Sequence, residues 1–228
     1  MRIVISGGHG QIARRLARLL VARGDDVVSV VRQPEHVAVV GQDGASAMLL
    51  DLELTDVARA VVAVDGADAV VFAAGAGPGS GVTRKDSVDR GGAVLMAAAA
   101  ERAGVRRHVQ ISSMGTEHVR GGAVPAGVEP VFVAYLQAKL AAEDDLRSRT
   151  GLDWTIVRPG RLTDAAGTAR VTLAPTVPRG SVARDDVAAV VVALLDNPGT
   201  SGQVLELTEG LTPIDDAVAA VVQTNQES

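Results

Sequence analysis

The stretch Ile3-Val4-Ile5-Ser6-Gly7-Gly8-His9-Gly10-Gln11-Ile12-Ala13 decides how this chain folds. Its apolar residues form a short run typical of a β-strand that is covered on both faces. Gly7 allows a tight turn because it lacks a Cβ, and Gly10 lets a ligand approach the backbone. A helix after this turn would direct unpaired N–H groups and its dipole at a negative ligand. The stretch therefore predicts a phosphate site, with the pyrophosphate of a dinucleotide as the favoured ligand.

The spacing of these glycines is G-x-x-G-x-x-A and differs from the G-x-G-x-x-G of the commonest dinucleotide fingerprint. By itself it also fits an ordinary strand-to-helix turn. Its position directly after a strand and before a strongly periodic helix favours dinucleotide binding. The apolar residues expected on one face of that helix are Ile12, Ala13, Leu16, Leu19 and Leu20.

The second predicted strand, residues 27–31, ends before Pro34 and completes a right-handed βαβ unit. An acidic residue at the end of this strand binds the ribose hydroxyls of NAD, whereas an arginine suits the additional phosphate of NADP. Arg32 holds this position, so the sequence favours NADP(H) over NAD(H). A solvated loop arginine is the alternative interpretation.

Further elements follow along the chain. Strands are expected at residues 47–52, 68–74, 107–111, 155–159, 169–173 (as an edge strand) and 203–207, and helices at 56–64, 86–102, 131–148, 184–195 and 213–222. Residues 33–46 show no clear element, Thr212 is a possible helix cap, and residues 225–228 are expected to fray. Asp51 either faces the adenine or begins a turn. The glycine-rich segment 75–81 either leaves room for a ligand or is a linker.

Composition bounds the class of protein. The chain has 228 residues, 47% of them hydrophobic and 2% aromatic, which fits one α/β domain over residues 1–228. A net charge of −5 argues against nucleic acid as a partner, and no apolar run is long enough for a membrane span. There is no cysteine, the histidines lack metal-ligand spacing, and no leader precedes the first strand. A cytoplasmic protein without a metal is expected.

Three polar residues suggest chemistry. Ser113 follows a predicted central strand, on the ligand side of the sheet, and Tyr135 and Lys139 lie one helical turn apart. A nearby ammonium lowers the pKa of a tyrosine and makes it a better acid or base. Ser113 would hold a substrate carbonyl or hydroxyl beside the phenol. A core tyrosine next to a surface lysine is the alternative.

With these residues in place, the chain resembles the short-chain dehydrogenase/reductase (SDR) superfamily, specifically its atypical NAD(P)-binding, epimerase/dehydratase-like members. The landmarks of the resemblance are residues 7–13, Arg32, 72–75, 89–92, 111–113, 135–139 and 155–160, the last of which ends in Arg158-Pro159-Gly160. The resemblance departs from the family at His9 and at Asp89, which replaces a frequent asparagine. It implies a Rossmann-like, doubly wound, mostly parallel sheet with helices on both faces and a small C-terminal extension, in which residues from about 160 form the substrate side.

The resemblance also implies the site. Ser113, Tyr135 and Lys139 would be catalytic. The expected cofactor-binding residues are Gly7, His9, Gly10, Gln11, Ile12, Arg32, Asp51, Leu52, Ala73, Ala74, Gly75, Ile111, Lys139, Pro159 and Gly160. The favoured function is an NADP(H)-dependent oxidoreductase that acts on a small carbonyl or alcohol. The alternatives are an epimerase or dehydratase, and a non-catalytic NADP(H) sensor that acts through a protein partner.

Overall fold

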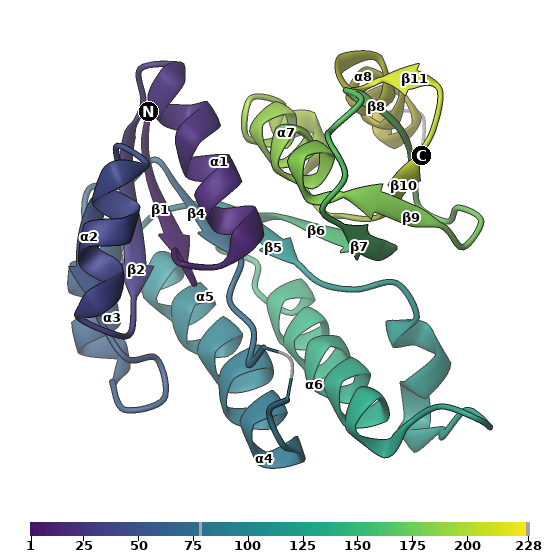
Figure 1. Cartoon of the computed structure of the whole chain (residues 1–228), viewed down its shortest axis with the longest axis horizontal. Coiled ribbons are helices and arrows are strands. Elements are labelled where there is room, and N and C mark those ends of the chain that lie inside the picture. Colours follow the sequence, from purple (N-terminus) through teal and green to yellow (C-terminus); the bar gives the residue numbers. More distant parts are fainter. Residues whose placement is uncertain (78, 227–228) are drawn as a thin grey trace.

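The computed structural model describes residues 1–77 and 79–226. The chain forms a large sheet between two layers of helices (Figure 1). The order of its nine strands is β11-β8-β10-β6-β5-β4-β1-β2-β3. The parallel strands are β1 (Arg2–Ser6), β2 (Asp26–Val31), β3 (Ser46–Leu49), β4 (Ala69–Phe72), β5 (Arg107–Ile111), β6 (Asp153–Pro159) and β10 (Gln203–Glu209). The order reverses between β1 and β4, which confirms the Rossmann-like, doubly wound fold.

Strand β1 shows how the sequence builds the two layers. Ile3 and Ile5 point into one core, and Val4 points into the other, because successive side chains of a strand alternate. The first core is closed by α1 (Gln11–Ala22), α7 (Arg184–Leu195) and α8 (Ile214–Gln226). The second is closed by α3 (Val57–Val64), α5 (Ala93–Arg102) and α6 (Pro130–Arg147). Figure 1 shows these two sets of helices on opposite faces of the sheet.

Helix α1 begins directly after the glycine turn, as the sequence predicts. Its buried residues are Ala13, Leu16, Ala17 and Leu20, which is the i, i+3, i+4, i+7 stripe of an amphipathic helix. Leu19, predicted on the same face, is 43% exposed, because the helix turns it toward solvent at the edge of that stripe.

Two sequence-based assignments on the first half of the chain are wrong. Residues 33–46 contain the helix α2 (Glu35–Gln42), which begins after Pro34 because proline is tolerated in a first helical turn. The helix predicted over 86–102 is composite. It begins as α4 (Val82–Arg84), widens into the π-helix η1 (Lys85–Gly92) and continues as α5. Within this widened turn, the Asp89 side chain accepts a hydrogen bond from the Ala76 N–H and pairs with Lys139 of α6.

The second half of the chain differs in smaller ways. Strand β8 (Arg170–Ala174) is not at the edge, because the two-residue β11 (Thr212–Pro213) pairs beyond it, and β8 is antiparallel to both of its neighbours, β10 and β11. Thr212 and Pro213 therefore extend the sheet, and α8 begins at Ile214. Helix α8 reaches Gln226, beyond the predicted end, and residues 227–228 lie outside the described ones. Strands β7 (Arg161–Thr163) and β9 (Ser181–Ala183) form an unpredicted second sheet.

Other predicted boundaries hold within a few residues. Strand β3 ends at Leu49, so Asp51 lies in the loop after it, and β4 ends at Phe72. The loop after β5 contains the 3-10 helix η2 (Thr116–Gly122), and another, η3 (Pro198–Thr200), precedes β10. Asp56 caps α3 by accepting a hydrogen bond from the Arg59 N–H. None of the helices in the described ranges is long and apolar enough to cross a membrane.

Candidate functional site

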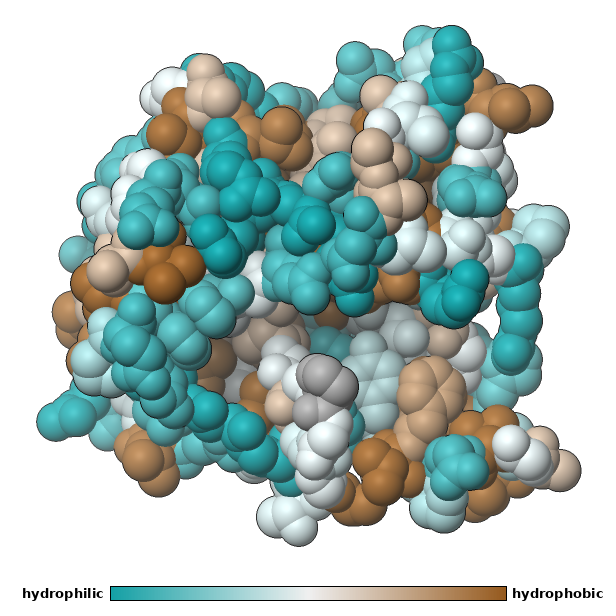
Figure 2. Space-filling view, in the orientation of Figure 1, coloured by the Kyte–Doolittle hydropathy of each residue, from teal (hydrophilic) through white to brown (hydrophobic). Residues whose placement is uncertain are grey.

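The carboxyl ends of the parallel strands open into a cleft. Figure 2 shows the surface hollowed between the hydrophilic atoms over α1 and the elements α4 and α6 on the other side. Two cavities lie at this edge of the sheet. One, of about 170 Å³, extends from the glycine turn to the end of β3, and the other, of about 490 Å³, lies between α6 and the start of β7. We call them the adenosine pocket and the substrate pocket, after the groups that the sequence analysis expects at the two ends of the cleft.

The glycine turn is packed tightly between neighbouring strand ends. Gly7 has a φ of +75°, and a Cβ on it would lie 2.5 Å from the Ala74 Cα. A Cβ on Gly8 would lie 2.5 Å from the Cβ of Ser29. Both glycines are therefore required by packing, and the turn brings the start of α1 to the mouth of the cleft.

The start of α1 fits an anion. Gly10 caps the helix without a side-chain hydrogen bond, so the N–H groups of the first turn remain available to a ligand. This donor set suits the pyrophosphate of a dinucleotide. His9, in the same turn, stacks on His36 with ring centroids 3.6 Å apart. Desolvation by partial burial, followed by the charge of His36, lowers the pKa of His9.

The adenosine pocket gathers many of the predicted cofactor residues. Those that line it are Gly7, Arg32, Asp51, Leu52, Ala74 and Gly75. Asp51 accepts a hydrogen bond from the Glu53 N–H at 2.9 Å, so it begins a turn and also lines the cavity. The turn interpretation of Asp51 is therefore confirmed, and its contact with the adenine stays a prediction.

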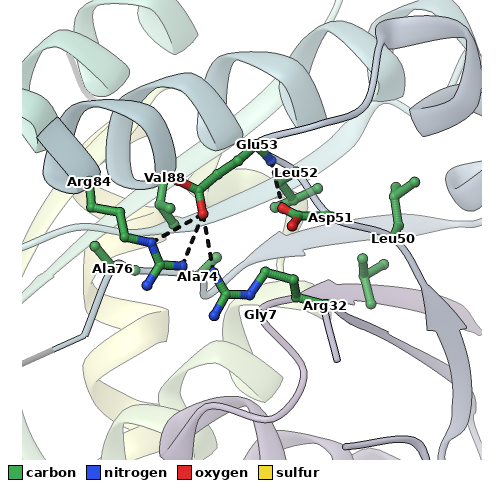
Figure 3. Close-up of a pocket in the computed structure, with 12 residues that line it drawn as sticks. Gly7, Arg32, Leu50, Asp51, Leu52, Glu53, Ala74, Ala76, Arg84 and Val88 are labelled. Carbon is green, nitrogen blue, oxygen red and sulfur yellow. Dashed lines mark hydrogen bonds and ion pairs between the residues drawn. The ribbon is translucent and has the colours of Figure 1, made fainter. Parts of the chain in front are cut away.

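A shared carboxylate occupies the side of this pocket. Figure 3 shows Arg32 and Arg84 pointing at Glu53 from opposite directions. The Glu53 Oε2 accepts from Arg32 Nη1 at 3.2 Å and from Arg84 Nη2 at 2.9 Å, and its Oε1 accepts from Ser87 at 2.7 Å. Two arginines around one anion form a site that also suits a phosphate. The sequence indicated only Arg32, because Glu53 and Arg84 belong to no recognisable motif.

Lys139, on α6, is buried and only 4% exposed. Its Nζ donates to the carbonyl oxygens of Ala74 and Ile111 at 3.3 and 3.2 Å, and lies 3.3 Å from the buried Asp89 Oδ1. The other oxygen of Asp89 accepts from the Ala76 N–H at 3.0 Å. Asp89, the departure from the family pattern, therefore balances the charge of Lys139 and links η1 to α6 and to the loop after β4.

The substrate pocket contains the other predicted polar residues. Ser113, Tyr135, Pro159 and Gly160 all line it. The Ser113 hydroxyl donates to the Met114 carbonyl at 3.1 Å, and the Tyr135 ring lies 5.9 Å from the Lys139 Nζ and 5.4 Å from the Lys85 Nζ. Lys85, the first residue of η1, was missed because it belongs to no recognisable motif. The structure thus places two ammonium groups within 6 Å of the Tyr135 ring, at the wall of a cavity that Ser113 also lines.

A buried ion pair lies next to this wall, on the side of the protein core. The Glu143 carboxylate accepts from Ser112 and forms a close pair with Arg158, the arginine of the Arg-Pro-Gly motif. Arg158 also donates to Glu117 of η2 at 2.7 Å. Glu143 was missed, although it continues on α6 the i, i+4 series of Tyr135 and Lys139 and could have been noticed there.

The remaining predicted cofactor residues do not line either pocket. They are His9 and Gly10 on the turn before α1, Gln11 and Ile12 in the first turn of α1, Ala73 and Ile111 at the ends of β4 and β5, and the buried Lys139 of α6. Ile111 contributes its carbonyl oxygen to Lys139.

The fold and the site together define a nicotinamide-dinucleotide-binding protein of the atypical SDR type. The pattern of the NAD(P)H-binding family matches residues 7–198, and the chain belongs to that family. It is also 36% identical over 219 residues to the uncharacterized sugar epimerase YhfK of Bacillus subtilis, covering 96% of this chain and 99% of that one.

Solved structures agree with this assignment. A candidate NAD-dependent epimerase/dehydratase from Bacillus halodurans superposes with a TM-score of 0.86 at 35% identity and covers 97% of this chain and 100% of that chain. ChuY, an anaerobilin reductase from Escherichia coli O157:H7, superposes with a TM-score of 0.78 at 25% identity, over 93% of this chain and 100% of that chain.

Proposed function

We propose that the chain is an NADP(H)-dependent oxidoreductase that transfers a hydride to or from a small carbonyl or alcohol. The observation that carries the proposal is the substrate pocket, in which Ser113 and Tyr135 share one cavity with Pro159 and Gly160. In the atypical SDR resemblance the last two residues lie beside the nicotinamide. The pocket would thus place a carbonyl group between a hydride source and two hydroxyl donors.

The residues of the site divide the reaction between them. A bound NADPH would supply the hydride. Tyr135 would give its proton to the carbonyl oxygen while the carbonyl carbon is reduced, and Ser113 would donate a hydrogen bond to the same oxygen. The product is an alcohol. Positive charge on Lys139 and Lys85 lies beside the ring that loses a proton, and favours that transfer.

The preference for NADP(H) rests on Arg32 and Arg84. In the structure they share the Glu53 carboxylate, and we propose that the 2′-phosphate of the cofactor takes over these donors. Cofactor fluorescence titrations test this directly. NADPH should bind about 10-fold more tightly than NADH, and Arg32→Ala should remove most of the difference. Arg59→Ala, which changes an exposed arginine without a side-chain ion pair in the described structure, is the matched control. Equal affinity for both cofactors would refute the preference.

Turnover tests the chemistry. A screen of carbonyl compounds and quinones for NADPH consumption should find a substrate whose kcat falls at least about 100-fold in Tyr135→Phe. Equal turnover in both proteins would remove Tyr135 from catalysis. Tight NADPH binding without consumption of any acceptor would favour the non-catalytic sensor. Epimerisation of a sugar substrate with no net change in NADPH would favour the activity for which the Bacillus subtilis relative is named.

A further inference from the structure

The substrate pocket differs in charge from the chain as a whole. The full sequence carries 27 acidic and 22 basic residues other than histidine. The described residues that line the pocket nevertheless include no aspartate or glutamate, whereas Arg161, Arg179 and His118 are among them. A cavity with this charge disfavours a cation and attracts an anion.

Arg161 and Arg179 are also free of internal partners. Their guanidinium groups form no hydrogen bond or ion pair within the described ranges. Thirteen other arginines of this chain are held by carboxylates, including Arg158 only three residues before Arg161. Two unpaired guanidinium groups in one acid-free cavity therefore have donors to offer to a ligand.

The backbone holds the two arginines together. Arg161 begins β7, and Arg179 lies two residues before β9, which pairs with β7 in parallel. The Arg161 N–H donates to the Gly180 carbonyl at 2.9 Å. A Cβ on Gly160 would lie 2.4 Å from the same oxygen, so the two segments are in close contact. Arg161 and Arg179 are thus carried by neighbouring segments at one border of the pocket.

The opposite wall is apolar. It is formed by Val128, Phe132 and Leu136, with the Tyr135 ring beside Phe132 at a centroid distance of 5.6 Å. Such a wall suits an aromatic or aliphatic body and offers few partners to the hydroxyls of a sugar. The pocket is therefore polar and positive at one border and apolar at the other.

We infer that the substrate is an apolar, preferably aromatic, carbonyl compound that carries a carboxylate, and that Arg161 and Arg179 bind this carboxylate. The inference rests on the proposed function for the carbonyl, but the anion site is argued from charge and geometry alone. The guanidinium fork matches a carboxylate through two parallel hydrogen bonds. The apolar body packs on Phe132 and Leu136, and the carbonyl lies toward Ser113 and Tyr135.

Three ketones of the same framework test the inference: 4-acetylbenzoate, its neutral counterpart 4-methylacetophenone, and 4-acetylphenyl phosphate. Binding is measured by calorimetry to the full chain, with and without NADP⁺, which cannot reduce a ketone. 4-Acetylbenzoate should bind about 10-fold more tightly than 4-methylacetophenone. The double variant Arg161→Gln/Arg179→Gln should lose this preference without changing the affinity for the neutral ketone. Arg147→Gln, an exposed arginine outside the pocket, should retain it.

Several results would overturn the inference. The charged and neutral ketones could bind equally, or 4-acetylbenzoate could fail to bind at millimolar concentration. The carboxylate preference could also survive in the double variant. Tighter binding of 4-acetylphenyl phosphate would assign the site to phosphate. Turnover with NADPH separates this inference from the proposed function. A carboxylate preference without any NADPH consumption keeps the anion site and removes the reductase. Reduction of the charged and neutral ketones with equal kcat/KM keeps the reductase and removes the anion site.

Discussion

Glu53 is the residue whose charge most directly opposes the proposed cofactor. Its carboxylate lies among Arg32, Arg84 and Ser87, where the 2′-phosphate would bind. We predict that Glu53→Gln raises the affinity for NADPH about 3- to 5-fold, because a competing negative charge is removed at a partly exposed site. The affinity for NADH should change little. Fluorescence titration of both cofactors measures this, and an equal gain for NADH would show that Glu53 acts on the adenosine rather than on the phosphate.

His108 carries a second residue-scale prediction. It is fully buried on β5, and neither ring nitrogen has a hydrogen-bond partner in the described structure. Burial, assisted by Arg107, lowers its pKa to about 3. A histidine in the unfolded chain has a pKa of about 6.5. At a pH between the two pKa values, the unfolded chain therefore binds a proton at His108 and the folded chain does not. Stability contributed by the neutral ring is therefore complete above pH ~6.5 and is lost as the pH falls toward about 3.

The size of this effect follows from linkage. Between pH 7 and pH 5 the parent should lose about 2 kcal/mol of unfolding free energy through His108 alone. His108→Leu should not show this loss, whereas His118→Gln, at an exposed histidine, should keep it. Urea unfolding at both pH values gives the comparison. If the parent and His108→Leu lose the same amount, the ring is protonated in the folded state or has a partner there.

At the scale of elements, helix α6 connects the wall of the substrate pocket to the buried core. Tyr135, Lys139 and Glu143 follow one another at i, i+4 and i+8, and each contacts a different part of the cleft. Glu143 is fully buried and pairs with the buried Arg158, which also bonds the exposed Glu117. Hydrogen bonds from Arg120 and then Arg158 lower the pKa of Glu117 to about 2.

The two carboxylates on Arg158 should differ sharply in their effect on stability. Glu143→Gln leaves a buried guanidinium without its counter-charge and should cost about 3 kcal/mol or more in unfolding free energy. Glu117→Gln removes an exposed partner of the same group and should cost less than about 1 kcal/mol. Urea denaturation of both variants measures this. Equal losses of unfolding free energy in the two variants would contradict the conclusion that Glu143 is the main counter-charge of Arg158.

Elements with strong periodicity were predictable from the sequence. Strand β1, the glycine turn and α1 carry local signals, and α7 shows its acidic first turn at Asp185 and Asp186. Helix η1 was not predicted as a π-helix, and the contacts of its Asp89 with the Ala76 N–H and Lys139 join residues that are distant in sequence. For the same reason Glu53 and Glu143 could not be given partners before the fold was known. Sequence locates the residues of a site, and tertiary contacts decide their charge environment.

At the scale of the whole molecule, the glycine turn and the Arg-Pro-Gly end of β6 lie on strands that are separated by β4 and β5. The proposed cofactor would extend across this distance, from Arg32 and the start of α1 to Pro159. Binding to the folded state alone stabilises it, by about 2.7 kcal/mol at a ligand concentration 100 times Kd. NADPH should therefore raise the free energy of unfolding by this amount and protect both segments at once.

Hydrogen exchange with a truncated ligand separates the two ends. NADPH should slow amide exchange in residues 7–13 and in residues 159–161 together, because the adenosine half contacts the first and the nicotinamide half the second. Adenosine 2′,5′-bisphosphate contains only the adenosine half, so it should protect the first segment and leave the second unchanged. Arg32→Ala should weaken the protection by both ligands. If the truncated ligand also protected residues 159–161, ligand binding would slow exchange in the whole molecule. Protection of these residues would then be no evidence that the nicotinamide binds beside them.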